Sequence, residues 1–378
     1  MAFSFGFAGD DIDMDDSEVN ETFETSTTAV QPTDARASLP ELVPARRHDM
    51  TEWVPSLASQ ISFNKLAIRT PPDATSGKPI TLARREVFDI RTQLMAEDTA
   101  DEDNEELIAG LEKGDIKPNF YEGGFKTWEC AVDLARLLVD AGELANAASE
   151  DRHIIETNDA NLQLGAGTAV PSLALFAQLL LSDPDPEPSS STRRTHFTFA
   201  DYNSAVLRLV TFPNLLLTWN YIVSRREMPE GLTQEEEELD ITPELVNSFR
   251  EDLTRRGITV DFVSGAWSPA FVDLVFASGE PGSRAALVLA SETIYSPASL
   301  SAFSETLVAL LRRPVEEGAR SRALVAAKKV YFGVGGGVDE FLAVLGGVDG
   351  GDQLQVEEQL DVKSEGVGRV VLEVALRQ

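Results

Sequence analysis

One segment of this chain combines a short apolar strand, a glycine turn and a long apolar helix. Residues 153–156 (HIIE) indicate a buried strand, residues 164–168 a glycine-rich turn, and residues 170–181 a helix that is apolar almost throughout. Pro171 falls in the first helical turn, where its missing N–H costs little. Strand, glycine turn and helix in this order open a nucleotide-type α/β fold. We therefore predict an α/β chain with a mostly parallel, doubly wound sheet.

The remaining apolar segments follow in an order that fits such a sheet. Apolar positions at helical spacing predict helices over residues 128–142 and 205–219. The last two apolar segments surround Glu365-Gly366-Val367-Gly368 and predict a C-terminal antiparallel hairpin. The further predicted strands are residues 195–200, 259–263, 286–290, 329–334, 354–362 and 370–376.

Composition separates a tail from the rest of the chain. No Lys or Arg occurs before Asp34, while Asp, Glu, Ser and Thr dominate, so this segment cannot bury enough apolar surface to fold alone. Phe3, Phe5 and Phe7 alternate there, and either dock on the domain or a partner or belong to a disordered end. We predict an acidic, mostly disordered tail over residues 1–37, an extension with loops and a short strand (82–90) over 38–119, and a main domain over 120–378 with inserted loops at 182–194 and 228–245.

The charge balance limits the partners that the chain can have. The net charge is −31 and the isoelectric point is about 4.4, which argues against a direct nucleic-acid binder, because phosphate contacts need clustered Lys and Arg. A basic protein partner fits this charge, although many acidic proteins are simply soluble. Cys130 is the only cysteine, which excludes an internal disulfide and fits a reducing cytosol or nucleus. We expect a cytoplasmic and nuclear monomer that does not bind membranes.

Two positions in the predicted sheet could hold a nucleoside. In the turn Leu164-Gly165-Ala166-Gly167-Thr168-Ala169, missing side chains let backbone N–H groups approach a ligand, although the turn could simply pack strand on helix. Val170 stands where a dinucleotide motif has its third glycine, so a nicotinamide or flavin site is disfavoured. Asp201 follows the second strand, where a carboxylate can accept ribose hydroxyls; alternatively, Asp201-Tyr202-Asn203 could cap the next helix.

Several dispersed motifs resemble those of the histidine protein methyltransferase family. They are FYEGGFKTWEC from Phe120, LGAGTAVPSL from Leu164, ADYNSAVL from Ala200, SGAW from Ser264, SETIY from Ser291 and AKKVYFGVGGG from Ala327, in that order, with FSFGF near the start. The resemblance covers nearly the whole chain. It implies a seven-strand Rossmann-like class I methyltransferase that uses S-adenosylmethionine.

The resemblance also implies which residues hold the cofactor. Those at its methionine end would be Thr127, Trp128, Glu129, Cys130, Ala131 and, from the glycine turn, Gly165. Those at its adenosine end would be Asp201, Tyr202, Asn203, Gly265, Ala266 and Trp267. Ser291 would end the fourth strand. Related lysine methyltransferases carry Asp-x-x-Tyr there, whereas Ser291-Glu292-Thr293-Ile294-Tyr295 favours the histidine branch.

The chain departs from the family pattern in two places. Residues 157–163 (TNDANLQ) separate Glu156 from the glycine turn, so either a polar bulge follows Glu156 or the strand slides to residues 161–164 and puts Gln163 at the acidic position. We favour the bulge, because residues 153–155 make the better buried parallel strand. Ala266 stands where relatives usually carry an acidic residue. If that carboxylate contacts the adenine in relatives, its absence here would weaken cofactor binding by about 1 kcal/mol.

The reaction implied by the resemblance is methylation of the tele nitrogen of a histidine in the large-subunit ribosomal protein uL3. Imidazole, with an ordinary pKa of about 6.5, is mostly neutral at cellular pH and needs no strong base, only selection of one nitrogen. Glu292 is the candidate that orients this ring, with capping of the next helix as its alternative role. The histidines of the chain itself, His48, His153 and His196, are scattered along it and do not suggest a metal site.

Two other functions stay open at this point. A lysine methyltransferase of the same superfamily would need a pocket of carboxylate and aromatic side chains to accept a deprotonated lysine. An acidic binding protein for a basic ribosomal partner, impaired in catalysis, would fit the insertion after Glu156 and the loss of the acidic residue at Ala266.

Overall fold

A computed structural model describes residues 42–69, 79–97, 124–143, 151–157, 166–182, 194–227, 237–278, 285–315, 319–333, 335–363 and 366–377. The predicted acidic tail, Gly165 and residues 158–163 of the insertion lie outside the described residues.

The main sheet has the strand order predicted for a seven-strand methyltransferase. Its strands are β1 (Arg46–His48), β4 (Arg152–Thr157), β5 (Thr195–Asp201), β7 (Ile258–Ser264), β8 (Ala285–Ser291), β9 (Arg322–Lys328), β10 (Leu354–Val362) and β11 (Arg369–Leu376). They lie in the order β1-β7-β5-β4-β8-β9-β11-β10. From β7 to β9 all neighbours are parallel, while β11 runs antiparallel between β9 and β10. If the seven strands other than β1 are renumbered 1 to 7 in chain order, their order across the sheet is 3-2-1-4-5-7-6. The predicted parallel sheet with a reversed last strand is therefore confirmed.

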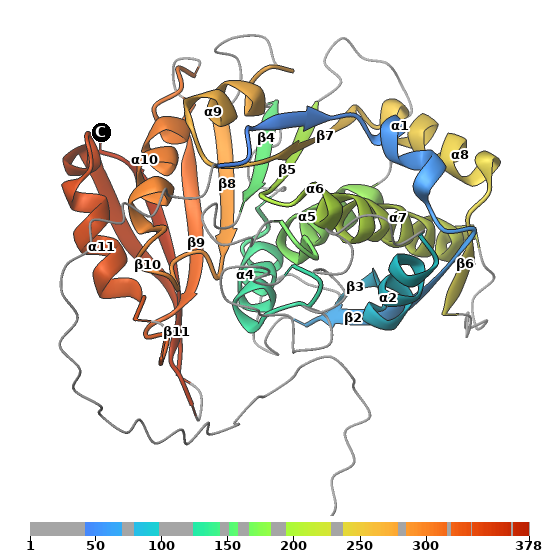
Figure 1. Ribbon diagram of the computed structural model, residues 1–378, viewed down its shortest axis with the longest axis horizontal. Helices are drawn as coiled ribbons and strands as arrows, with labels where there is room; N and C mark the ends of the chain where they lie inside the picture. The colour runs from blue at the N-terminus through green and yellow to red at the C-terminus, as the bar shows by residue number, and fades with distance from the viewer. Residues whose placement is uncertain are drawn as a thin grey trace, which may run out of the picture.

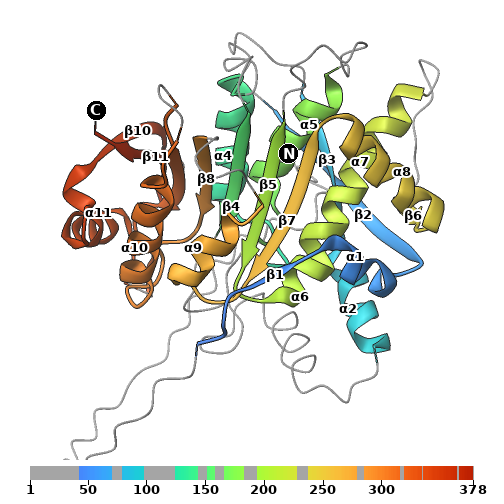
Figure 2. The ribbon, with the colours of Figure 1, turned by 90° about the horizontal axis from the view of Figure 1, so that it is seen from above.

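Helices cover both faces of this sheet, as a doubly wound fold requires (Figures 1 and 2). One face carries α4 (Glu129–Asp140), α5 (Val170–Leu181) and α7 (Phe212–Glu227), and the other carries α9 (Pro269–Val275), α10 (Leu300–Leu311) and α11 (Val338–Gly347). The helix α8 (Pro243–Arg255) contacts both α7 and β7. Each face buries its own hydrophobic core. Residues 204–225 are long and apolar enough to cross a membrane, but 83% of their apolar window is buried, as in a core helix.

A second, three-stranded sheet lies beneath the first helical layer (Figure 1). It contains β2 (Gln60–Ile68), β3 (Ile80–Arg85) and β6 (Glu238–Asp240) in the order β3-β2-β6, and it contacts α4, α5 and α7. The extension also contains α1 (Met50–Trp53) and α2 (Val87–Ala96), more structure than predicted. The predicted strand over 82–90 is wrong beyond Arg85, because buried Ile90 and Leu94 repeat at helical spacing. Likewise β6 and the start of α8 occupy part of the predicted loop 228–245.

Two other strand predictions have different outcomes. The strand predicted over 329–334 is wrong: the strand is β9, whose buried Ala323–Ala327 pairs with β8 and β11, and a glycine-rich turn follows it. The first strand, β4, includes Glu156, which pairs in register with Phe199 and Leu289. The strand therefore occupies residues 152–157 and includes the acidic residue, which is the placement that we favoured.

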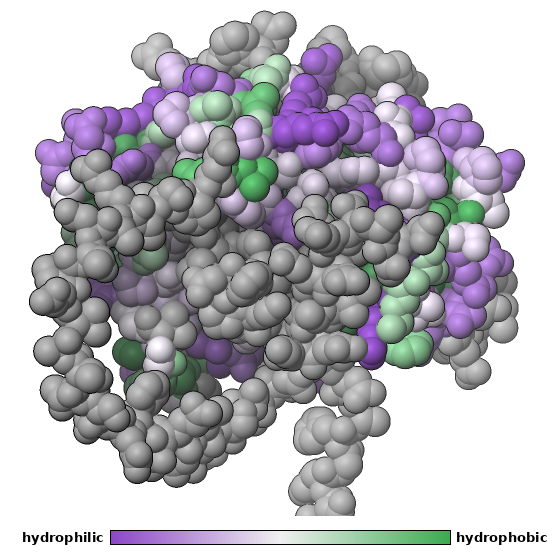
Figure 3. Space-filling model, viewed as in Figure 1, coloured by the Kyte–Doolittle hydropathy of each residue, from purple (hydrophilic) through white to green (hydrophobic). Residues whose placement is uncertain are grey.

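On the face shown in Figure 3, hydrophilic residues make up most of the described surface, and hydrophobic residues form small separate groups. The apolar side chains of the described chain lie mainly between the layers.

Candidate functional site

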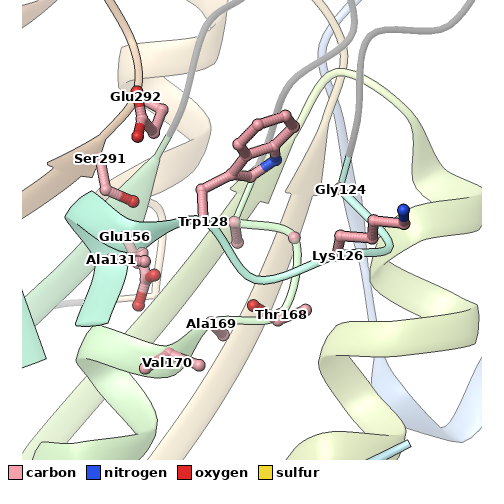
Figure 4. Close-up of a pocket in the computed structure, with 12 residues that line it drawn as sticks. Gly124, Lys126, Trp128, Ala131, Glu156, Thr168, Ala169, Val170, Ser291 and Glu292 are labelled. Atoms are coloured by element: carbon pink, nitrogen blue, oxygen red, sulfur yellow. The ribbon is translucent and has the colours of Figure 1, made fainter. Parts of the chain in front are cut away.

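A pocket lies at the carboxyl ends of β4 and β8, where the strand order of the sheet reverses. Ligands of open α/β sheets bind at this place. It is lined by Gly124, Lys126, Trp128, Ala131, Glu156, Ala166, Gly167, Thr168, Ala169, Val170, Ser291 and Glu292. Figure 4 shows Ser291 and Glu292 on one side, Gly124 and Lys126 on the other, and Trp128 between them.

The glycine turn forms one wall of the pocket. Gly167 has a φ of +53°, and a Cβ at this position would lie 3.1 Å from the carbonyl oxygen of Gly124, so a side chain would crowd the opposite loop. Ala169, also at positive φ (55°), precedes the first residue of α5. The turn therefore brings main-chain N–H groups and the N-terminus of a helix to the pocket, an arrangement suited to a polar ligand.

Side chains from the neighbouring helix fix the carbonyl groups of this turn. Thr211 Oγ1 donates to Gly167 O (2.7 Å), and Asn214 Nδ2 donates to Thr168 O (3.1 Å). Thr211 ends a π-helical turn, Leu207–Thr211, a type of irregularity that is frequent at functional sites. Asn214 also accepts the main-chain N–H of Arg85 (2.7 Å) and so ties the turn to the second sheet. The sequence reasoning missed both residues, because they look like ordinary positions in an apolar helix.

Asp201 joins the second strand to the glycine turn. Its buried carboxylate accepts the main-chain N–H of Gly167 (3.3 Å) and of Asn203 (2.9 Å). The capping role considered for Asp201-Tyr202-Asn203 is confirmed at Asn203, whose Oδ1 accepts the N–H of Ala205 at the start of the next helix. Asp201 therefore lies beside the turn, at the place predicted for a ribose acceptor.

The other residues predicted for the adenosine end lie in two loops that the N-terminal segment crosses. Val43 N donates to the hydroxyl of Tyr202 (3.4 Å), and Ala266 N donates to Val43 O (2.9 Å). Trp267 Nε1 donates to Thr157 Oγ1 (3.1 Å) at the end of β4. These residues gather at the carboxyl edge of β4, β5 and β7, but they do not line the pocket of Figure 4.

Gly265 allows this crossing, which gives a first prediction. Its φ is +103°, and a Cβ would lie 2.5 Å from the carbonyl oxygen of Pro44, a backbone atom that cannot rotate away. We expect Gly265→Ala to lower the free energy of unfolding by about 1–3 kcal/mol and to displace the segment before β1. Thermal unfolding and limited trypsin cleavage after Arg46 and Arg47 measure both effects. Unchanged melting and cleavage would contradict the crossing.

The residues predicted for the methionine end have different environments. Trp128 and Ala131 line the pocket. Thr127 accepts a hydrogen bond from Arg84 (2.5 Å) and donates to Thr168 Oγ1 (2.9 Å), and so supports the wall. Glu129 forms an ion pair with Lys328 Nζ (3.5 Å). Burial raises the pKa of the Cys130 thiol well above its usual value, as expected for a packing residue beside a carboxyl group.

Glu292 contributes a buried carboxyl group to the pocket. It is a non-glycine residue at positive φ (58°), a strained conformation of the kind that clusters at functional sites. Tyr331 donates a hydrogen bond to its Oε2 (2.5 Å), while Oε1 has no partner among the described residues. Burial raises its pKa above the usual value. The alternative role as a helix cap is wrong, because the next helix begins at Leu300 with Ser299 at its N-cap.

Two buried polar atoms of pocket residues have no hydrogen-bond partner among the described residues. Besides Glu292 Oε1, the indole Nε1 of Trp128 is buried and has no partner within the part of the chain that the structure describes. Each unpaired buried group costs about 1–3 kcal/mol. The pocket is therefore lined by a donor that lacks an acceptor and an acceptor that lacks a donor, which fits a polar ligand such as the predicted cofactor with its substrate.

Glu156 was not among the predicted cofactor residues. Its side chain is buried, accepts the N–H of Ser172 (2.8 Å), and has a pKa raised to about 8 by burial. Its place as the last carboxylate of a buried parallel strand could have identified it, because ligands bind at that end of the sheet.

The histidines of the chain lie away from the pocket. His153 and His196, which looked scattered in the sequence, have ring centroids 4.5 Å apart on neighbouring strands, and His196 Nε2 lies 3.2 Å from Asp261 Oδ2. Among the described residues, no group of three or more His, Cys, Asp or Glu side chains has the geometry of a metal site.

Comparison with known proteins gives sequence relatives along the whole chain. Histidine protein methyltransferase 1 of Saccharomyces cerevisiae is 33% identical over 98% of this chain and 98% of its own length. Histidine protein methyltransferase 1 of Schizosaccharomyces pombe is 34% identical over 70% of this chain and 69% of its own length. A homolog from Bos taurus is 28% identical over 70% of this chain and 58% of its own length. No protein-family model matches the chain.

Solved structures give weaker likenesses. A magnesium protoporphyrin IX methyltransferase from Synechocystis with bound SAH covers 77% of this chain and 94% of its own, at 11% identity and a TM-score of 0.31. An rRNA methylase from Streptococcus thermophilus covers 64% of this chain and 98% of its own, at 11% identity and a TM-score of 0.31. These scores are low, and the fold assignment rests on the strand order of the sheet.

Proposed function

The chain belongs to the histidine protein methyltransferase family, and from this premise we propose that it methylates the tele nitrogen of a histidine in ribosomal protein uL3. Its cofactor is S-adenosylmethionine. The observation that carries the proposal is Glu292, a buried residue that lines the pocket and whose Oε1 has no hydrogen-bond partner among the described residues. A group that accepts the N–H of one imidazole nitrogen selects the other nitrogen as the nucleophile.

The residues at the pocket fit this cofactor. The glycine turn, Trp128 and Ala131 would hold its methionine end, and Asp201 would accept the ribose hydroxyls. The buried carboxyl of Glu156 would supply a negative charge to a cationic ligand when that ligand displaces its proton. S-adenosylmethionine supplies an activated methyl group on a positively charged sulfur.

The residues on the opposite wall would act on the substrate. A lone pair on the imidazole nitrogen forms the new N–C bond as the C–S bond breaks, and the proton on the other ring nitrogen leaves afterwards. Glu292 Oε1 would accept that N–H, which holds the ring in one tautomer and receives the proton after transfer. Positioning of this kind, rather than strong base catalysis, is what a neutral imidazole requires.

The charge of the chain supports a basic protein substrate. A net charge of −31 attracts a basic partner over long range and favours encounter rather than tight binding. We propose that the protein acts as a monomer in the cytoplasm and nucleus, without direct contact to nucleic acid.

Calorimetric titration with S-adenosylmethionine and its demethylated product, followed by labelling of recombinant uL3, tests this function. Saturable binding that Gly165→Arg abolishes, with the methyl group on a histidine, is the expected result. Methylation of a lysine would favour the lysine branch, and no cofactor binding in a folded sample would favour the binding-protein alternative. Labelling of another protein at histidine would retain the enzyme class and reject uL3.

Binding of the cofactor should release a proton from Glu156. In the free protein this carboxyl, with a pKa of about 8, is mostly protonated at pH 7, and a nearby cation lowers that pKa. We expect up to about one proton released per cofactor near pH 7, and affinity that rises as pH increases towards 8. Calorimetry in two buffers with different ionisation enthalpies measures the release, and Glu156→Gln should abolish it. Equal heats in both buffers for the unaltered chain would contradict this role.

A further inference from the structure

The loop after β9 is held tightly against the segment that follows β8. Tyr331 N donates to Gly336 O (3.0 Å), and Gly335 N donates to Tyr331 O (3.2 Å). A Cβ on Gly336 would lie 2.1 Å from the carbonyl oxygen of Tyr295, so only glycine allows the two backbones to approach this closely. The position of Tyr331 is therefore set by backbone contacts rather than by its own side chain alone.

Side chains in this loop alternate between solvent and the protein interior. Val330 is 49% exposed and Phe332 is 78% exposed, while Tyr331 between them turns inward. Its ring contacts that of Tyr295, with centroids 6.2 Å apart. Its hydroxyl donates to Glu292 Oε2 (2.5 Å) and accepts the main-chain N–H of Lys328 (3.2 Å). The hydroxyl thus has a fixed direction, with its O–H bond pointing at the carboxyl group of Glu292.

We propose that Tyr331 is a positioning residue for methyl transfer, which holds Glu292 by Oε2 so that Oε1 faces the substrate imidazole. This inference rests on the proposed function of Glu292 and adds a residue whose loop lies 39 positions further along the chain. With Oε2 engaged by Tyr331, Oε1 is the carboxyl oxygen without a hydrogen-bond partner among the described residues, and it would accept the imidazole N–H. A carboxyl group with two open oxygens could accept that N–H in several ring orientations, so the hydrogen bond from Tyr331 narrows the choice of nitrogen.

The groups around Glu292 determine how its ionisation responds to this contact. Burial raises the pKa of Glu292, and the negative charge of Glu129 adds to this rise. Three neighbours lower the same pKa: Lys328, Cys130 and Tyr331. Burial raises the pKa of Tyr331 well above its usual value, so its hydroxyl stays protonated and can only donate to the carboxylate. Loss of this donor would therefore raise the pKa of Glu292 further. The ionised form of Glu292 is the one that accepts the imidazole N–H. As the solution is acidified, Tyr331→Phe would therefore lose activity at a higher pH than the unaltered chain.

The test compares Tyr331→Phe with Tyr221→Phe in the full chain, with recombinant uL3 as substrate. Tyr221 is a matched control, because its hydroxyl is also hydrogen-bonded, to Arg225 on α7, but lies outside the pocket. For Tyr331→Phe we expect kcat to be about tenfold lower than in the unaltered chain. KM and the affinity for the demethylated cofactor should stay within about threefold of the unaltered values. The acid limb of the pH profile should move to higher pH. Tyr221→Phe should match the unaltered chain. In a Glu292→Gln background, Tyr331→Phe should lower kcat no further.

Each outcome decides between the proposals. Additive losses in the double variant, or an unchanged acid limb in Tyr331→Phe, would overturn the positioning role even if the enzyme is active. Absence of histidine methylation by the unaltered chain would instead overturn the proposed function. In that case, infrared titration of the Glu292 carboxyl, identified by difference from Glu292→Gln, still measures whether Tyr331→Phe raises its pKa.

Discussion

Replacement of Glu292 by Gln should lower kcat for histidine methylation by about 10²- to 10³-fold while cofactor affinity stays within about threefold. Gln has the same shape and can still accept the hydrogen bond from Tyr331 through its amide oxygen. Its NH₂ group would then replace Oε1, so a donor would face the imidazole N–H. The nucleophilic nitrogen would no longer be selected, although the cofactor pocket is intact. Single-turnover labelling and calorimetry separate the two effects.

The pH profile gives a second measurement on the same residue. The pKa of Glu292 is raised above its usual value, so the ionised form, and with it activity, should be lost as pH falls through that raised pKa. Protonation of the substrate histidine adds a limb near its ordinary pKa of about 6.5, which Glu292→Gln should retain. The matched control is Glu373→Gln on β11, which removes a carboxylate partner of Arg322 on β9 and should leave kcat unchanged. A Glu292→Gln protein with full activity would exclude the proposed orientation of the ring.

Replacement of Asp201 by Ala should weaken cofactor binding by about 10²-fold or more. The carboxylate holds the main-chain N–H groups of Gly167 and Asn203, and its removal would release the glycine turn as well as the proposed ribose acceptor. Hydrogen bonds to a charged group contribute about 1.5–3 kcal/mol each, so the loss of two accounts for a change of this size. Calorimetric titration with the demethylated product of the cofactor measures it.

A second buried aspartate separates loss of binding from loss of stability. Asp252 on α8 accepts hydrogen bonds from Trp219 Nε1 on α7 (2.9 Å) and from Arg256 Nε just after α8 (3.0 Å). It lies outside the pocket. Asp252→Ala should lower the free energy of unfolding by about 1–3 kcal/mol without altering cofactor affinity. If both variants lost affinity equally, Asp201 would have a structural role only.

Much of the sheet could be predicted because local patterns specify it. Residues 153–156 and the terminal hairpin form β4, β10 and β11, as their alternation and flanking turn residues indicated. The strand predicted over 329–334 was wrong because apolar residues in a glycine-rich turn look like a strand when their partners are unknown. Pairing with β8 and β11 favours Arg322–Lys328 instead.

The sequence by itself determined the order of strands, glycine turn and helices, and the resemblance named the residues at the ends of those strands. These properties depend on neighbours within a few positions, where hydrophobic spacing and turn chemistry act directly. Only the tertiary structure decided that Tyr331 reaches Glu292, that Thr211 and Asn214 hold the glycine turn, and that the segment before β1 crosses Gly265. Such contacts join residues 39 to about 220 positions apart, and they exist because parallel strands bring their carboxyl ends to one edge of the sheet.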